Sequence, residues 1–148
     1  MSYRKIYYHI VLTTKYRKKT LPLEHHVELY KYICGITKNK NCILYQINGY
    51  TEHLHLLTDL NPTIALADFI RDIKAYSSKW LKENPKFPKF TGWSIGYGAF
   101  TISHFDKEKI IRYIKKQKEH HNKNKFKTEY MQFLKKHDID FEEKYLWT

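Results

Sequence analysis

The chain has 148 residues, enough for one domain with a substantial hydrophobic core and too few for two independent domains. Its content of 42% hydrophobic and 28% charged residues excludes a wholly disordered chain. Lys and Arg number 27 against 15 Asp and Glu, a net charge of +12. This excess favours a polyanionic partner, because cations that neutralise phosphates release condensed counterions. Nucleic acid is therefore the expected partner, with a membrane surface as the alternative from charge alone.

The sequence contains no pattern typical of secretion or membrane insertion. Residues 1–19 lack the apolar run, ending at small residues, of a signal peptide. No apolar stretch approaches the roughly 20 residues needed to span a bilayer. Cys34 and Cys42 provide neither a disulfide framework nor zinc-ligand spacing. We expect a cytoplasmic protein without a membrane partner.

The first half of the sequence predicts a strand, a helix and a hairpin. Residues 7–13 (YYHIVLT) are β-branched and aromatic, as in a buried strand. Pro22 opens a helix. Its apolar residues recur at helical spacing: Leu23, Val27, Tyr30 and Cys34. Residues 42–48 and 53–57 predict two strands joined by a tight turn.

A second helix is predicted over residues 63–83, where apolar residues form a continuous stripe. The stripe consists of Leu66, Phe69, Ile70, Ile73, Ser77, Trp80 and Leu81. Residues 84–92 contain two prolines and a glycine, which end regular structure. A fourth strand is predicted over residues 93–103, and Gly96 and Gly98 are expected to bend it.

A third helix is predicted to begin at Asp106 as N-cap and to end at about His121, with Phe105 packed against Ile110 across its start. Residues 122–148 predict an appended helix and tail, so residues 1–148 form a single domain. The order β-α-β-β-α-β followed by helices predicts a ferredoxin-like α+β fold. Its four-stranded antiparallel sheet carries two helices on one face, and the other face is expected to be free for a site or a partner.

Two histidines alternate along the third predicted strand. His53 and His55 share one face of that strand, while Leu54 and Leu56 face the helices. Two imidazoles at this spacing can hold one divalent ion. With 9 histidines in the chain, a chance pair on a sheet face is the alternative.

Tyr113 and Gln117 lie four residues apart on the third predicted helix and are therefore neighbours on one face. A tyrosine hydroxyl is a weak nucleophile, but a metal bound to the target phosphate makes the phosphorus easier to attack. Gln117 can offer its amide oxygen beside two histidines, and mixed nitrogen and oxygen ligands suit Mg²⁺ or Mn²⁺. The alternatives are a half-buried helix tyrosine and a solvated glutamine.

A basic turn follows the first predicted strand. Its candidate DNA-binding residues are Lys15, Tyr16, Arg17, Lys18 and Lys19. The cations suit phosphates and the ring suits an unstacked base. A solvated basic turn is the alternative. Three lysines near Tyr113, at positions 115, 116 and 118, are also expected to raise the local DNA concentration.

Four segments together resemble the single-tyrosine HUH transposases of the insertion sequence 200/605 type, where U is a hydrophobic residue. These segments are the first strand with residues 14–17, then 53–55, 96–100 and 113–117. Residues 126–147 also resemble the tails of that family. The likeness covers nearly the whole chain in the same order.

The resemblance implies a specific site. His53 and His55 would ligate Mg²⁺ or Mn²⁺, with Gln117 as the third protein ligand. Tyr113 would attack a DNA phosphorus, which leaves a 5′-phosphotyrosine and a free 3′-hydroxyl. Family members cut single strands near hairpins as dimers, with the tyrosine helix of one subunit completing the site of the other. We therefore expect a metal-dependent single-stranded DNA transposase that works as a homodimer.

Several alternatives remain open. Residues 96–100 resemble the aromatic strand of RNA-recognition modules, but the flanking pattern of that strand is not reproduced. Tyr113 with Lys116 also fits the Tyr-x-x-Lys pattern of rolling-circle replication initiators, although Gln117 and the tail favour the transposase. The histidine pairs at 25–26 and 120–121 are expected to be solvated helix ends. The alternative functions are a domesticated nuclease for repeat hairpins and a non-catalytic single-strand binder.

Overall fold

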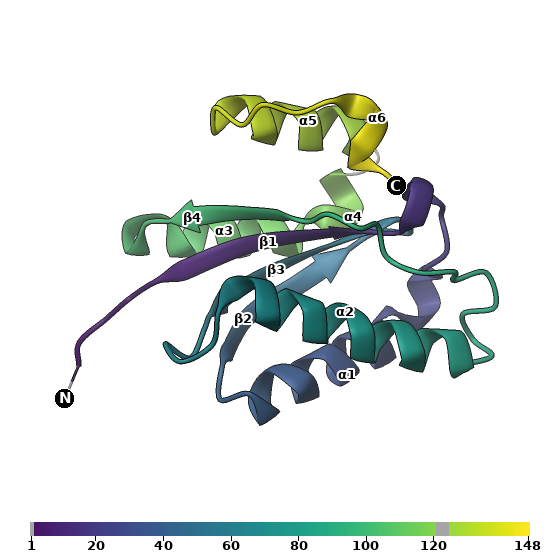
Figure 1. Cartoon of the computed structure of the whole chain (residues 1–148), viewed down its shortest axis with the longest axis horizontal. Coiled ribbons are helices and arrows are strands. Elements are labelled where there is room, and N and C mark those ends of the chain that lie inside the picture. The colour runs from purple at the N-terminus through teal and green to yellow at the C-terminus, as the bar shows by residue number, and fades with distance from the viewer. Residues whose placement is uncertain (1, 121–124) are drawn as a thin grey trace.

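A computed structural model describes residues 2–120 and 125–148 of the chain. Its centre is a four-stranded antiparallel sheet of order β2-β3-β1-β4 (Figure 1). The strands are β1 (Tyr7–Thr13), β2 (Ile43–Gly49), β3 (His53–Asp59) and β4 (Gly98–Ile102). With α1 (His26–Asn39) after β1 and α2 (Leu66–Glu83) after β3, the structure confirms the ferredoxin-like α+β prediction. No helix in the described part of the chain is long and apolar enough to cross a membrane.

One face of the sheet is covered by α1 and α2. Alternation in the two central strands sends Ile10, Leu12, Leu54 and Leu56 to this face, where all four are buried in the main hydrophobic core. The stripe on α2 packs against them, as predicted; its Phe69, Ile70, Ile73, Ser77 and Leu81 are buried. The polar member is satisfied, because Ser77 Oγ accepts a hydrogen bond of 2.9 Å from Trp93 Nε1.

The second face of the sheet is also covered, so the expectation of a free face was wrong. Its helices are α3 (Lys107–Lys115), α4 (Gln117–His120), α5 (Phe126–Lys136) and α6 (Glu143–Leu146). In Figure 1 the yellow-green α5 and α6 lie on the opposite side of the sheet from α1 and α2. The predicted tail helix contributes Tyr130 and Leu134, which are buried against Val11 and Phe100 of the sheet. The amphipathic tail therefore buries its apolar side on the sheet.

The close approach of α5 depends on a glycine in β4. A Cβ at Gly98 would lie 2.8 Å from the Tyr130 hydroxyl oxygen and 2.9 Å from a ring carbon of Tyr130. Only the missing side chain at Gly98 lets the tyrosine ring rest directly on the strand.

The start of the first helix differs from the prediction. A 3-10 turn at Leu23–His25 precedes α1, which begins at His26. The side of α1 that faces the core differs from the predicted one, because its buried residues include Leu29 and Ile33, while Val27 is 64% exposed and His26 is buried. His26 Nε2 donates to the Leu21 carbonyl at 3.0 Å, and Nδ1 accepts from the Tyr30 hydroxyl at 2.8 Å. The prediction of a solvated histidine was wrong for His26; His121 lies outside the described residues.

The fourth strand is shorter than the predicted range of 93–103. It begins at Gly98, and Trp93 forms only an isolated bridge with Thr14. Between them, the carbonyls of residues 94–96 accept hydrogen bonds from the Lys74 ammonium at 2.7–2.9 Å. Because a lysine on α2 takes these acceptors, the segment does not continue the strand.

The third helix begins directly after Asp106, which holds the predicted N-cap position, but the predicted side-chain contacts at this start were wrong. The Asp106 side chain makes no capping hydrogen bond; instead Ser103 Oγ accepts from the Phe105 N–H at 3.3 Å. Phe105 is 94% exposed, so it does not pack against Ile110 across the helix start. The helix also ends earlier than expected, at Lys115, and α4 follows after one intervening residue.

Candidate functional site

β3 brings both predicted histidines to the face covered by α3–α5. His53 and His55 are buried, and their ring centroids lie 5.0 Å apart. The intervening Leu54 points to the opposite core. The prediction that the two imidazoles share a face is therefore confirmed by the alternation of this strand.

Both ring nitrogens of His53 face an oxygen. Nδ1 donates to Glu52 Oε1 at 2.6 Å, and Nε2 lies 3.0 Å from Gln117 Oε1. A carboxylate on the outer nitrogen of a histidine is a common support for a metal ligand, because it fixes the ring and its tautomer. Glu52 was not identified from the sequence, although it directly precedes the first histidine.

His55 has a second histidine as its partner. Its Nδ1 lies 2.8 Å from Nε2 of His9, a fully buried residue of the neighbouring strand β1. Burial, with a smaller contribution from the charge of His137, lowers the pKa of His9 to about 4. The His9 ring is thus neutral at pH 7 and can accept a hydrogen bond. Sequence reasoning missed His9, whose only signal was its place between Tyr7 and Val11 on the same face of a strand.

The predicted nucleophile lies next to these histidines. The ring centroid of Tyr113 is 5.7 Å from that of His55 and 6.1 Å from that of His9. Gln117, one turn later, is fully buried. Asn48 of β2 holds the end of α3 between them, since its amide donates to the carbonyls of Ile114 and residue 115 at 3.0 Å each. The structure therefore brings Tyr113, Gln117 and the two histidines into one cluster.

A cleft of about 400 Å³ opens beside this cluster, between β4, α3 and α5. His9 and Tyr113 line its inner part, while the exposed Lys109 and Lys136 lie among its outer residues. The mouth of this cleft therefore carries two lysines and the carboxylate of Asp106. Neither lysine was singled out from the sequence.

The C-terminal helix α5 covers the other side of the cluster. Phe126 stacks face to face on His53, with ring centroids 3.8 Å apart and an angle of 5°. Glu129, one turn later, is buried; burial first and the charge of Glu52 second raise its pKa to about 7. The helix therefore places a ring on the first histidine and a second carboxyl group near Glu52.

The donor set resembles a cation site. In the described part of the chain no three His, Cys, Asp or Glu side chains converge as a metal cluster. The third donor would be an amide oxygen, that of Gln117, which faces His53 Nε2 across 3.0 Å. A divalent cation bound there would accept one lone pair from His53 Nε2 and one from Gln117 Oε1. Two imidazoles and one amide oxygen with further positions open fit Mg²⁺ or Mn²⁺.

The predicted basic turn lies at the same end of the sheet as His53. It forms a 3-10 turn at Lys15–Arg17, directly after Thr14, whose N–H donates to the Glu52 carbonyl at 2.9 Å. Four of its five predicted DNA-binding residues are exposed, namely Lys15, Tyr16, Lys18 and Lys19. Arg17 differs, because its guanidinium stacks 5.0 Å from the ring centroid of Trp147 near the C-terminus.

The three lysines around Tyr113 are not equivalent. Lys115 and Lys116 are exposed, as expected for cations that attract DNA. Lys118 instead donates to Asn48 Oδ1 at 2.6 Å and is half-buried, and its burial lowers its pKa. Its ammonium therefore supports the contact between α4 and β2.

Comparisons with known proteins identify the family of this chain. Residues 2–117 match the family described as Transposase IS200 like. The IS200 transposases of Salmonella typhimurium and Salmonella typhi are each 28% identical over 117 residues, which is 76% of this chain and 76% of theirs.

Two solved structures have a similar fold. A Deinococcus radiodurans protein assigned as a transposase is 25% identical, with a TM-score of 0.58 over 79% of this chain and 95% of that one. A REP-associated tyrosine transposase bound to a REP hairpin has a TM-score of 0.62 over 82% of this chain and 74% of its own, at 15% identity. The family match spans most of the chain, and the protein accordingly belongs to the IS200-like transposase family.

Proposed function

We propose that the protein is a DNA strand transferase and single-strand endonuclease that cuts and rejoins DNA near hairpins through a covalent bond to Tyr113. The convergence of Tyr113 and Gln117 with His53 and His55 in one cluster supports this function. These four residues come from two segments about 60 positions apart in the chain. A protein that only binds single strands requires no such cluster.

The reaction exchanges one phosphodiester for another. The Tyr113 oxygen forms a bond to the DNA phosphorus, and the bond from phosphorus to the 3′ oxygen breaks. The tyrosine proton is lost, the 3′ oxygen gains a proton, and a 5′-phosphotyrosine remains. In the reverse direction a DNA 3′-hydroxyl attacks this ester and releases the tyrosine. The ester keeps the energy of the broken bond, so rejoining requires no nucleotide cofactor.

His53, His55 and Gln117 would hold a divalent cation, Mg²⁺ or Mn²⁺, at this site. Such a cation neutralises charge on the phosphate and makes its phosphorus easier to attack. Glu52 and His9 would orient the two histidines, because each accepts the Nδ1–H of its partner and leaves Nε2 directed to the site. The lysines at the cleft would attract the substrate phosphates.

The DNA is proposed to be a single strand with a hairpin end. A neighbour with the same fold was solved with a REP hairpin, and the net charge of +12 favours a polyanion. The family resemblance further predicts a homodimer with sites completed in trans. In the single chain Tyr113 lies beside its own histidines, so a mixture of Tyr113→Phe and His53→Ala proteins tests this prediction. Recovered cleavage supports sites shared between subunits that exchange; no recovery supports sites within one chain.

The reaction is tested with a labelled hairpin oligonucleotide taken from the DNA flanking the gene. Wild-type protein should form a denaturant-resistant protein–DNA adduct with Mg²⁺ or Mn²⁺ and none with chelator. Tyr113→Phe should abolish the adduct and change hairpin affinity by only a few-fold, since only a hydroxyl is lost. Tyr145→Phe, a matched change at a 64% exposed tyrosine, should leave the adduct intact. An adduct with Tyr113→Phe would overturn the assignment.

Two other functions give different results in this assay. A non-catalytic binder would bind the hairpin without any adduct in both metals. A domesticated nuclease for repeat hairpins would form the adduct, but the DNA around its gene would lack transposon ends.

A further inference from the structure

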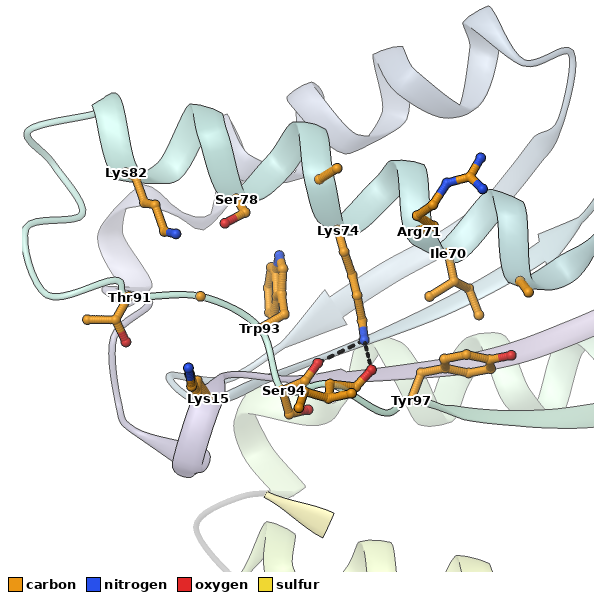
Figure 2. Close-up of a pocket in the computed structure, with 14 residues that line it drawn as sticks. Lys15, Ile70, Arg71, Lys74, Ser78, Lys82, Thr91, Trp93, Ser94 and Tyr97 are labelled. Carbon is orange, nitrogen blue, oxygen red and sulfur yellow. Dashed lines mark hydrogen bonds between the residues drawn. The ribbon is translucent and has the colours of Figure 1, made fainter. Parts of the chain in front are cut away.

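A groove of about 540 Å³ runs between α2 and residues 91–97, on the side of the sheet opposite Tyr113 (Figure 2). Its floor on α2 is formed by small residues at helical spacing, including Ala67, Ala75 and Ser78. The opposite wall consists of the irregular segment that precedes β4. None of the residues that line the groove is acidic.

The far wall of the groove is fixed in place. Lys74 reaches across from α2, and its ammonium donates to the carbonyls of Ser94, Ile95 and residue 96 (Figure 2). The Ser94 N–H donates to the Thr13 carbonyl at 2.8 Å, and the Ile95 N–H donates to the Thr148 carbonyl at 2.7 Å. A wall tied to a helix, a strand and the C-terminal segment is preorganised for a ligand.

Two lysines lie at one end of the groove, on opposite walls. Lys15 from the basic turn and Lys82 from α2 are both exposed and lie near the hydroxyl groups of Ser78 and Thr91 (Figure 2). Among the ion pairs of the described residues, neither lysine has a carboxylate partner. Arg71, on the same helix, differs because its guanidinium donates to the carboxylates of Asp68 and Asp72. The two lysines are thus the cations that a ligand can engage.

The other end of the groove carries exposed apolar groups. Ile95 is 83% exposed and Tyr97 is 41% exposed, although the backbone that holds them is fixed. Cations at one end and an accessible aromatic ring at the other match a nucleic-acid strand, whose phosphates need positive charge and whose unstacked bases pack on rings. Along α2, Arg71 and Lys82 lie 11 positions apart, a rise of about 16 Å, which is room for several nucleotides.

We propose that this groove is a second DNA contact, in which Lys15 and Lys82 hold the phosphodiester backbone and Tyr97 packs against a base. The DNA held there is a segment of the substrate away from the bond that Tyr113 attacks, since the two sites lie on opposite faces of the sheet. Lys15 connects them: it follows Thr13 and Thr14, which pair with the His53 end of β3. The proposal rests on the proposed DNA-cleaving function.

The test measures the affinity of a hairpin oligonucleotide with single-stranded flanks by fluorescence anisotropy over a range of salt concentrations. All proteins carry Tyr113→Phe, so that binding is read without cleavage. Adding Lys15→Gln and Lys82→Gln together should weaken binding about tenfold and reduce the slope of log affinity against log salt by about 2. Tyr97→Ala should weaken binding several-fold without changing that slope.

Lys79→Gln is the matched control, because Lys79 is an exposed lysine of the same helix that does not line the groove. The melting temperatures of all variants should agree, since the substituted lysines are exposed. If the double variant binds like the control, with an unchanged slope, the groove is not a DNA contact even though the protein cleaves DNA. If the protein with an intact groove binds no hairpin, the proposed function and the groove proposal fail together.

Discussion

The two faces of the sheet are built from the same strands but bury different chemistry. On the face under α1 and α2, the strands contribute mainly apolar side chains such as Leu12 and Leu56. On the face under α3–α5, the same strands bury His9, His53 and His55. Burial of polar groups costs free energy unless each one is hydrogen-bonded, and unusual buried polar groups concentrate at functional sites. The face under α1 and α2 therefore contributes mainly to stability, and the face under α3–α5 carries the proposed catalytic groups.

The largest effect is expected from His53→Ala. Loss of this proposed ligand removes an interaction with the metal, and metal assistance to phosphate attack contributes several kcal/mol, so adduct formation should fall about a thousandfold or more. Mn²⁺ binding, measured by electron paramagnetic resonance, should weaken in parallel. His25→Ala, at a half-buried histidine before α1, is the control. Unchanged Mn²⁺ affinity in His53→Ala would contradict the ligand assignment.

A leucine on the opposite face of the same strand should behave in the opposite way. Leu56→Ala, on the face under α1 and α2, should lower the free energy of unfolding by about 2–5 kcal/mol through lost burial and a cavity. Cleavage per folded molecule should stay near the wild-type rate at a temperature where the variant is folded. Urea denaturation and the adduct assay measure the two quantities. If Leu56→Ala instead lost cleavage and kept its free energy of unfolding, the two faces would not differ in function as proposed.

His9 provides a second test of the face under α3–α5, because it is proposed to orient the metal ligand His55 and not to bind the metal itself. His9→Phe removes the acceptor for His55 Nδ1, so Mn²⁺ affinity should fall about tenfold to a hundredfold. His9→Gln keeps a side-chain acceptor and should restore part of that affinity. A purely structural role would lower the melting temperature in both variants and leave Mn²⁺ affinity unchanged. Titration of each folded variant with Mn²⁺ distinguishes these outcomes.

The smallest effect concerns pH. The pKa of Glu129 is raised from 4.5 to about 7 by burial and by the charge of Glu52. The folded protein therefore keeps this proton to higher pH than the unfolded chain. The contribution of Glu129 to the free energy of unfolding is fully present below about pH 4.5 and is lost as the pH rises through about 7.

Glu129→Gln should flatten this dependence. The variant should melt at a higher temperature than wild type at pH 8, with a smaller difference at pH 5. Glu83→Gln, at an exposed carboxylate on α2, should show no such difference. Equal shifts in melting temperature at pH 5 and pH 8 would show that folding does not raise the pKa of Glu129.

Periodicity was sufficient for the order of elements and for the two faces of the strand that carries His53 and His55. The alternation in residues 53–57 correctly placed both histidines opposite the leucines, and the helical spacing correctly placed the stripe on α2. The supporting contacts of the site could not be predicted in this way. Pairing His9 with His55 requires the register between two strands 46 residues apart. Glu52 lies just outside the strand, where alternation gives no direction.

Errors at helix starts were errors of detail that residue spacing does not resolve. The buried stripe of α1 consists of His26, Leu29, Ile33 and Thr37, so His26 is buried and Val27 is exposed, the reverse of the prediction. At α3, Asp106 holds the N-cap position, but its side chain caps no N–H, and a serine hydroxyl caps the preceding 3-10 turn instead. The cover over His53 by Phe126 was also unforeseen, because an amphipathic tail does not indicate which surface it will cover.

The backbone at Tyr16 sets a limit on how the protein can be engineered. This residue has a left-handed conformation, with φ of 57°, although its ring is 57% exposed. A left-handed conformation costs a residue with a side chain about 1–2 kcal/mol, and glycine adopts it without that cost. Tyr16→Gly is thus expected to be neutral or slightly stabilising, while it removes a ring that we propose as a contact for a DNA base. On that proposal, selection for thermostability alone would favour a residue that weakens DNA binding, so libraries at this position need a binding screen as well.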